Sequence, residues 1–259
     1  MAIIWQKKTA NQIYQVRTAG HSIRLYSNNV FHSQWNPHTP IAGSLWDLLF
    51  LPVFFSPQVD RLNKALILGV GGGAIINLFN QYLSLDCIDG VDLDSTHIYI
   101  AKRFFGINGS NTYLHRAEAQ SWVSNSGRAK YDFVLEDLFL PETDSQDAVR
   151  AIEPSTAWFE TLLKKLSVRG ILVMNFESEK QFKRSDTCRK AKELCRLGKL
   201  GGVAFLKHPK YENCIAVFTK VAISKRTFDD NLQSYLFAGK AAVKIRLAYE
   251  LKIIQRGRN

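Results

Sequence analysis

The sequence has few cysteines, no long apolar run and no cluster of metal-binding residues. Its four cysteines stand at positions 87, 188, 195 and 214, without the spacing of zinc ligands, and we interpret them as reduced structural thiols. The longest apolar segment, residues 41–55, carries Asp47 and is too short to span a bilayer. Residues 1–8 lack the basic-then-apolar order of a signal peptide. We therefore expect a cytoplasmic protein with no metal site and no membrane anchor.

Acidic residues become scarce in the last third of the chain. Residues 1–179 contain 15 Lys and Arg against 17 Asp and Glu, whereas residues 180–259 contain 19 against 6, so the excess behind the net charge of +11 lies in the last third. This bias favours an acidic partner such as RNA or a ribosome. A solvated face that aids solubility is the alternative, because the aromatic-basic interleaving of a known RNA-binding module is missing. The sequence leaves a homodimer open.

The most informative segment, residues 66–94, has the pattern of a strand, a glycine turn, a helix, a second strand and an acid. Gly69, Gly71 and Gly73 let the backbone turn tightly and let a ligand approach closely. Asp92 ends the second strand about 20 residues on, where an acid can accept both hydroxyls of a ribose. The segment therefore predicts a nucleoside site.

Strand and helix patterns alternate from residue 66 to residue 176, which predicts a doubly wound, mostly parallel α/β sheet. A pair of antiparallel strands follows, at residues 203–206 and 214–218, and brings the expected sheet to seven strands. A small antiparallel β unit, residues 12–35, precedes it. Residues 228–254 have an apolar stripe at helical spacing, and we expect one or two amphipathic helices there.

Acids follow three successive strands of the expected sheet. Asp92 ends the second strand, Glu118 comes just past the third, and Asp137 follows the fourth directly. Ligands bind such sheets outside the carboxyl ends of the strands. A carboxylate there costs free energy unless it is solvated, paired or bound to a ligand, although each acid alone could be a helix cap or a loop residue. This pattern fits S-adenosylmethionine better than a dinucleotide, because it offers one acid for the ribose, a second acid for the adenine and a glycine loop.

Residues 13–220 resemble the spermidine synthase superfamily of class I, Rossmann-like methyltransferase folds. The resemblance rests on the LGVGGG loop, the VDLD strand end and the YDFVLEDLFLP segment. It implies that Asp92 binds the ribose, that Glu118 lies on the adenine side, and that Asp137 is the catalytic acid. His32 falls where the family often has a Gln near the nucleoside. Gly69, Gly71 and Gly73 complete the implied cofactor site.

Two departures from the family pattern concern the amine pocket. The family usually has an Asp where this chain has Gly72, and a second Asp where it has Leu140. Loss of both removes counter-charges for a cationic diamine. We therefore expect a spermidine-synthase-like, S-adenosylmethionine-dependent methyltransferase of unknown acceptor. The alternatives are an aminopropyltransferase using decarboxylated S-adenosylmethionine, and a non-catalytic nucleoside-binding or scaffold protein whose basic tail carries the function.

The expected chemistry is in-line displacement at the sulfonium carbon, which needs positioning and exclusion of water more than acid–base help. Asp137 either orients the incoming nucleophile or binds the α-amino group of the cosubstrate. We expect three regions: residues 1–58 as an N-terminal β unit with a connecting helix, residues 59–222 as the S-adenosylmethionine-binding Rossmann-like domain, and residues 223–259 as a basic helical tail.

Overall fold

The computed structural model describes residues 1–141, 148–238 and 247–257, and its centre is an eight-stranded sheet of order β14-β12-β13-β11-β8-β5-β6-β7. The pairs that join β11, β8, β5, β6 and β7 are parallel, and β13, β12 and β14 extend the sheet in antiparallel fashion. The predicted α/β class with a mostly parallel sheet is therefore confirmed. The strands are β5 (Lys64–Leu68), β6 (Cys87–Asp92), β7 (Thr112–Arg116), β8 (Tyr131–Glu136), β11 (Leu166–Phe176), β12 (Gly202–Lys207), β13 (Cys214–Thr219) and β14 (Glu250–Arg256).

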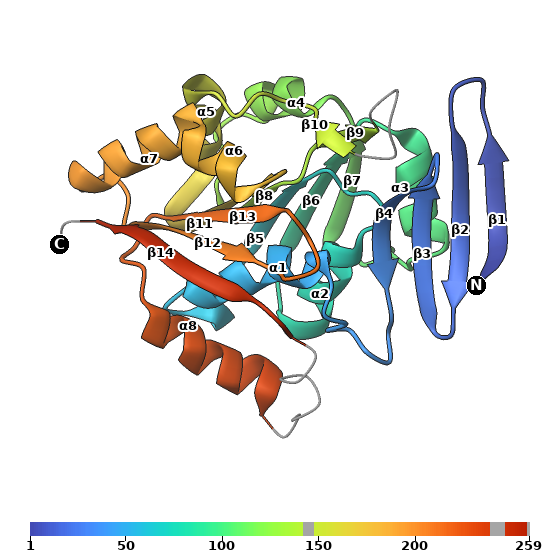
Figure 1. Cartoon of the computed structure of the whole chain (residues 1–259), viewed down its shortest axis with the longest axis horizontal. Coiled ribbons are helices and arrows are strands. Elements are labelled where there is room, and N and C mark those ends of the chain that lie inside the picture. The colour runs from blue at the N-terminus through green and yellow to red at the C-terminus, as the bar shows by residue number, and fades with distance from the viewer. Residues whose placement is uncertain (142–147, 239–246, 258–259) are drawn as a thin grey trace.

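Helices cover both faces of this sheet, and the alternation of side chains along each strand explains why (Figure 1). In β5, Ala65 and Ile67 belong to one buried cluster, while Leu66 and Leu68 belong to a second cluster on the opposite face. The first face carries α1 (Leu45–Phe50), α2 (Ala74–Tyr82), α3 (Ser95–Arg103) and α8 (Lys225–Leu232). The second carries α4 (Ala119–Asn125), α5 (Thr156–Lys165), α6 (Glu179–Arg184) and α7 (Asp186–Arg196).

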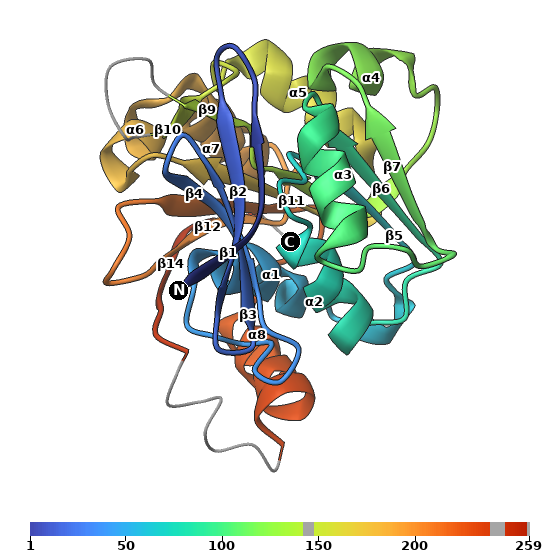
Figure 2. The same cartoon turned by 90° about the vertical axis from the view of Figure 1, so that its right-hand side faces the viewer.

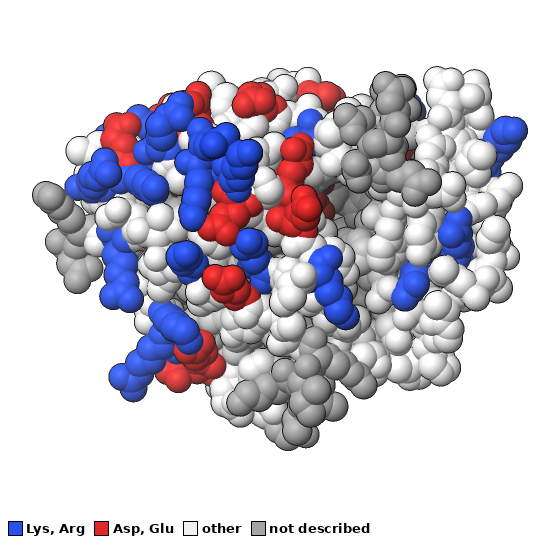
Figure 3. Space-filling view, viewed as in Figure 1, with Lys and Arg blue, Asp and Glu red and all other residues white. Residues whose placement is uncertain are grey.

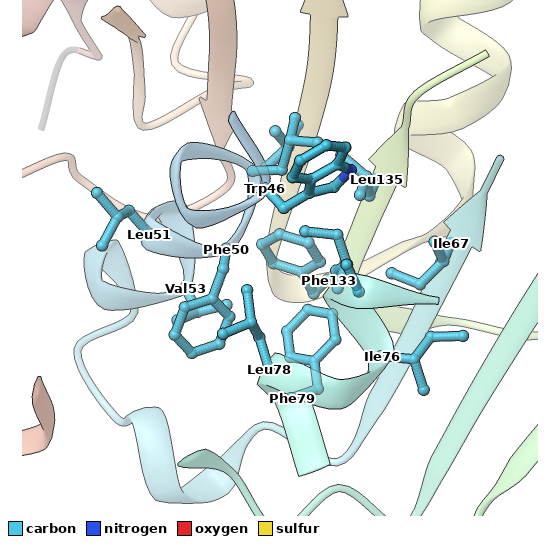
Figure 4. Packing of buried hydrophobic residues seen from close by; sticks show 14 of the residues in the cluster. Trp46, Phe50, Leu51, Val53, Ile67, Ile76, Leu78, Phe79, Phe133 and Leu135 are labelled. Atoms are coloured by element: carbon cyan, nitrogen blue, oxygen red, sulfur yellow. The ribbon is translucent and has the colours of Figure 1, made fainter. Parts of the chain in front are cut away.

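Aromatic rings fill the first of these clusters, as Figure 4 shows. Phe79 of α2 meets Phe133 of β8 edge to face, with ring centroids 5.1 Å apart, and Phe50 of α1 contacts Phe79 at 5.7 Å. All three rings are buried. The apolar segment at residues 41–55 thus forms α1 and a 3₁₀ turn, Leu51–Phe55, which pack on the sheet.

A separate antiparallel sheet lies at one side of the molecule, with order β1-β2-β3-β4 (Figure 2). Its strands are β1 (Ala2–Lys8), β2 (Ile13–Ala19), β3 (Ser22–Ser27) and β4 (Val30–Trp35). The β unit expected from residues 12–35 is therefore present, with β1 as an additional edge strand. Trp5 of β1 contacts Tyr99 and Phe104, each at 5.7 Å between ring centroids, and so attaches the unit to α3.

The expected helical tail is only partly helical. Residues Lys225–Leu232 form α8, but Glu250–Arg256 form β14, which pairs with β12 and gives the sheet its eighth strand. The prediction of helix for residues 250–254 was wrong because pairing with β12 outweighs the helical spacing of the apolar residues. Residues 239–246, where part of the predicted apolar stripe falls, lie outside the described residues.

Two short strands lie between β8 and α5. They are β9 (Phe139–Pro141) and β10 (Ala148–Arg150), which pair in antiparallel fashion. Residues 142–147 between them lie outside the described residues. The hairpin places Leu140 opposite Val149 beside the carboxyl end of β8.

Lys and Arg side chains gather on the side of the molecule formed by α6 and α7 (Figure 3). Several of them form ion pairs: Lys183 with Glu179, Arg189 with Asp186, and Lys190 with Glu160 and Glu193. Binding of RNA or a ribosome by this surface stays a prediction. In the described part of the chain, none of the helices combines the length and apolar character needed to cross a membrane.

The Phe79–Phe133 contact gives a test of the core. We expect Phe79→Ala to lower the free energy of unfolding by about 3–5 kcal/mol, because it removes a buried ring and leaves a cavity. Val168 is 88% exposed, so Val168→Ala is the control and is expected to change stability by less than about 0.5 kcal/mol. Denaturant unfolding measures both, and equal midpoints would contradict the assignment of this core.

Candidate functional site

A cavity of about 1160 Å³ lies at the carboxyl ends of the parallel strands, between the large sheet and the N-terminal sheet. Residues from β4, the glycine loop and the ends of β6, β7, β8 and β11 line it. The structure thereby brings together six predicted residues: His32, Gly69, Gly71, Asp92, Glu118 and Asp137. The seventh, Gly73, does not line the cavity. It begins α2, and a Cβ there would stand 2.7 Å from Ile107.

Gly69 marks the closest approach of two strand ends. Its φ is +92°, and a Cβ at this position would lie 2.0 Å from the carbonyl oxygen of Asp137. The Asp137 amide in turn donates to the carbonyl of Leu68 at 2.9 Å. A side chain at residue 69 would therefore push away the segment that carries the predicted catalytic acid.

Asp92 holds the glycine loop in place. Its Oδ2 accepts hydrogen bonds from the amides of Val70 and Gly71, both at 3.0 Å, and its Oδ1 accepts from the amide of Asp94 at 2.8 Å. Oδ1 has the capacity for one further donor, such as a ribose hydroxyl. Burial favours a raised pKa for Asp92, but His97 and the backbone amides outweigh it and lower the pKa. The carboxylate thus stays ionised.

His97 of α3 is one site residue that sequence reasoning missed, and Asn175 of β11 is another. The Nδ1 of His97 lies 3.6 Å from Oδ2 of Asp92, and its Nε2 lies 3.2 Å from the hydroxyl of Ser27. Burial favours a lowered pKa for the imidazole, but Asp92 and Asp94 outweigh it and raise the pKa. Only the spacing of His97 from Asp92 and Asp94 could have suggested this role, because Ser27 is distant in sequence.

His32 of β4 contacts this cluster, with its ring centroid 5.2 Å from that of His97 and the two rings tilted by 50°. Its Nε2 is buried and has no hydrogen-bond partner among the described residues. Burial, together with the charge of His97, lowers the pKa of His32 to about 4, so its ring is neutral at pH 7. A neutral ring suits a position beside a cationic ligand.

Glu118 begins α4 and acts as its N-cap. Its two carboxylate oxygens accept from the amides of Gln120 at 2.9 Å and Ser121 at 2.7 Å. Burial opposes the shift, but these amides outweigh it and lower the pKa of Glu118. The residue is exposed at the mouth of the cavity, so a capping role and contact with a ligand are compatible.

Asp137 lies at the end of β8 and belongs to a chain of amides. Asn175 Nδ2 donates to Oδ1 of Asp137 at 2.8 Å, and Asn213 Nδ2 donates to Oδ1 of Asn175 at 3.1 Å. Burial raises the pKa of Asp137 to about 6, despite the Asn175 amide. A carboxylate with this pKa, held in one orientation, can accept a proton near neutral pH.

The neighbouring acid, Glu136, has a structural role. Its two carboxylate oxygens accept from Nη2 of Arg150 at 2.7 and 2.8 Å, and the Glu136 side chain is fully buried. Arg150 Nη1 also contacts the carbonyl of Asn175. The pair thus supports the strand end that carries Asn175.

Gly72 faces away from the cavity. A Cβ at this residue would lie 2.6 Å from the ring of Phe105, which is buried. Leu140, by contrast, lines the cavity and is 50% exposed. Neither position places an acid in the cavity.

The sequence is similar to aminopropyltransferases over part of its length. A polyamine aminopropyltransferase of Vibrio vulnificus is 32% identical over 93 residues, which are 35% of this chain and 30% of that protein. A spermine synthase of Arabidopsis thaliana is 28% identical over 126 residues, 47% of this chain and 34% of that protein. The matched segments thus span about a third of these relatives. No protein-family model matches the sequence.

Solved structures of other proteins match the fold of this chain over its whole length. A probable spermidine synthase of Corynebacterium glutamicum superposes with a TM-score of 0.68 at 13% identity, covering 100% of this chain and 97% of that one. The protein therefore has a class I, Rossmann-like fold. Within that class, its fold is that of the spermidine synthases, as the resemblance implied.

The contact between Gly69 and Asp137 can be tested by a matched pair of substitutions. We expect Gly69→Ala to lower the midpoint of thermal unfolding and to abolish binding of 5′-methylthioadenosine, because the methyl group collides with the Asp137 backbone. Gly106→Ala is the control, since Gly106 has a φ of +73° and open space around its missing Cβ. Gly106→Ala should lower the free energy of unfolding by about 1 kcal/mol and leave the affinity for 5′-methylthioadenosine unchanged. If calorimetry showed equal losses of affinity for Gly69→Ala and Gly106→Ala, the close approach of residue 69 to the Asp137 backbone would have no special role in binding.

Proposed function

We propose that the protein is a transferase that passes the aminopropyl group of decarboxylated S-adenosylmethionine to an amine. The observation that carries the proposal is Asp137, a carboxylate oriented by Asn175 in the same cavity as the nucleoside residues Asp92 and Glu118. The names of the relatives support aminopropyl transfer over the methyl transfer that the sequence analysis put first.

Each predicted site residue would contact a different part of the cosubstrate. Asp92 would accept a ribose hydroxyl at its remaining Oδ1 site, Glu118 would lie on the adenine side, and the Gly69–Gly71 backbone would pass beneath the sulfonium chain. His32 also lines this cavity, and because its ring is neutral it adds no positive charge there. The cosubstrate brings its own activation, because the sulfonium makes the adjacent carbon electrophilic.

Asp137 would act on the acceptor. The amine nitrogen attacks the carbon bound to sulfur, the C–S bond breaks, and the electron pair leaves with the thioether nucleoside. Before this attack, the acceptor, which binds as an ammonium, gives one proton to the Asp137 carboxylate that Asn175 keeps in position, and the product is a secondary ammonium. The products are thus this ammonium, with its new C–N bond, and the neutral thioether nucleoside.

Methyl transfer is the second candidate. It is favoured by Leu140, which lines the cavity and supplies no acid for a cationic acceptor. It differs from aminopropyl transfer in the cosubstrate, since a methyl donor keeps the methionine carboxylate.

Calorimetry separates these two candidates. We expect decarboxylated S-adenosylmethionine to bind at least about tenfold tighter than S-adenosylmethionine, because Asp137 repels a further carboxylate in a cavity of low dielectric. Turnover should release 5′-methylthioadenosine and not S-adenosylhomocysteine. Tighter binding of the carboxylated form would overturn the aminopropyl proposal in favour of methyl transfer.

The role of Asp137 gives a second test. We expect Asp137→Asn to lower kcat by about 10²-fold or more while cosubstrate affinity stays within about twofold, because the amide cannot accept the proton. Asp186→Asn on α7 is the control and should change neither value, since Asp186 is exposed and remote from the cavity. Unchanged turnover in Asp137→Asn would leave the residue with a structural role only.

The pH dependence follows from the same carboxyl. Its pKa of about 6 means that the proton-accepting form is present above pH 6 and is lost below it. We expect kcat at saturating substrates to fall about tenfold per pH unit below pH 6. A profile that is flat between pH 5 and pH 7 would exclude Asp137 as the proton acceptor.

A further inference from the structure

The imidazole of His97 lines the cavity, and the proposed reaction gives it no role. Only 13% of its side chain is exposed. Its two ring nitrogens face different parts of the fold, because Nδ1 lies 3.6 Å from Oδ2 of Asp92 and Nε2 lies 3.2 Å from the hydroxyl of Ser27. Ser27 is a buried residue of β3 in the N-terminal sheet, whereas Asp92 ends β6 of the large sheet. His97 therefore bridges the two sheets at the predicted ribose acid.

The surroundings of His97 favour its charged form. Burial opposes a charge on the imidazole, but Asp92 and Asp94 outweigh burial and raise the pKa of His97. In the imidazolium form both ring nitrogens are donors, so one faces Asp92 while the other donates to Ser27. A buried cation costs free energy unless an acid pairs with it, and a hydrocarbon side chain would fill the same space without that cost. Packing alone therefore does not explain a histidine at this position.

The hydrogen bonds of Asp92 leave its Oδ1 to a ligand. Oδ2 accepts from the amides of Val70 and Gly71, which occupy its two lone pairs, and His97 faces the same oxygen. Oδ1 accepts from the amide of Asp94 and keeps a second lone pair. A ribose hydroxyl can donate to that lone pair only if the carboxylate keeps its present orientation. The charge of His97 beside Oδ2 helps to fix this orientation.

Two further hydrogen bonds fasten the N-terminal sheet to the start of α3. The hydroxyl of Tyr14 in β2 donates to Oδ2 of Asp94 at 2.6 Å, and Nζ of Lys7 in β1 donates to the hydroxyl of Thr96 at 3.2 Å. Together with Ser27 of β3, they join three strands of the N-terminal sheet to the segment that directly follows the ribose acid. The N-terminal sheet thereby restrains the acid from a distant part of the chain.

We infer that His97 is a positioning residue, which holds the Asp92 carboxylate in the orientation that a ribose hydroxyl requires and couples nucleoside binding to the packing of the N-terminal sheet. The inference rests on the nucleoside site of the proposed function and is independent of the group that is transferred. Coupling of this kind is reciprocal. If the contact with the N-terminal sheet strengthens nucleoside binding, the bound nucleoside strengthens that contact by the same factor.

Calorimetry with two ligands tests this role. The ligands are 5′-methylthioadenosine and its 2′,3′-dideoxy analogue, which keeps the adenine and the thioether but has no ribose hydroxyl. We expect His97→Leu to weaken binding of 5′-methylthioadenosine by at least about tenfold, because it removes a charged partner of Asp92. The affinity for the analogue should stay within about twofold. A general distortion of the cavity would weaken both ligands alike, so equal losses would overturn the inference.

A control and a second variant separate the two contacts of His97. His115→Leu removes a histidine that pairs with Asp89 at 2.7 Å outside the cavity, and it should change neither affinity by more than about twofold. Ser27→Ala removes the contact with the N-terminal sheet and should weaken 5′-methylthioadenosine by about threefold without affecting the analogue. An unchanged affinity in Ser27→Ala would overturn the coupling to the N-terminal sheet. If His97→Leu fails to fold, His97→Asn is measured with the same two ligands and should show a smaller loss, also confined to 5′-methylthioadenosine.

The outcomes distinguish this inference from the proposed nucleoside site. If the wild-type protein does not bind 5′-methylthioadenosine, both fail. If Asp92→Asn weakens binding of 5′-methylthioadenosine and the His97 variants do not, the nucleoside site stands and the positioning role of His97 is wrong.

Discussion

The carboxylate of Asp92 is the interaction on which the site depends. It accepts from the amides of Val70 and Gly71 with one oxygen and from the amide of Asp94 with the other, so it joins the glycine loop to the end of the neighbouring strand. Without it, three buried or half-buried amides would lose their acceptor. His97 completes this arrangement from α3. The acid therefore shapes the cavity before any ligand arrives.

The sheet was predictable because its strands are buried on both faces and read as apolar runs, as in β5 and β8. Two edge strands, β1 and β14, were not predicted from the sequence. In β1, six of seven residues are exposed, so the sequence has no apolar alternation to reveal a strand. In β14, pairing with β12 overrides an apolar pattern that also suits a helix. Both errors concern edge strands whose conformation depends on pairing with a neighbouring strand, β2 for β1 and β12 for β14.

The gathering of candidate residues in one cavity was predictable where they lie at strand ends, as at Asp92 and Asp137, and their roles stay predictions. Sequence reasoning did not find the contacts between separate units. His97 meets His32 and Ser27 only because the N-terminal sheet packs against α3. Gly73 belongs to helix packing, and the Glu136–Arg150 pair needs the β9–β10 hairpin to form. Tertiary contacts of this kind leave no local pattern.

The packing of Phe105 against Gly72 has a consequence for how the protein could evolve. The ring occupies the volume that any side chain at residue 72 would need, so an acid there requires a smaller residue at 105 as well. Either change alone costs stability, through a steric clash or through an empty space in the core. Acquiring a carboxylate at this point of the loop would thus need two coordinated mutations, so a core contact outside the cavity keeps residue 72 a glycine.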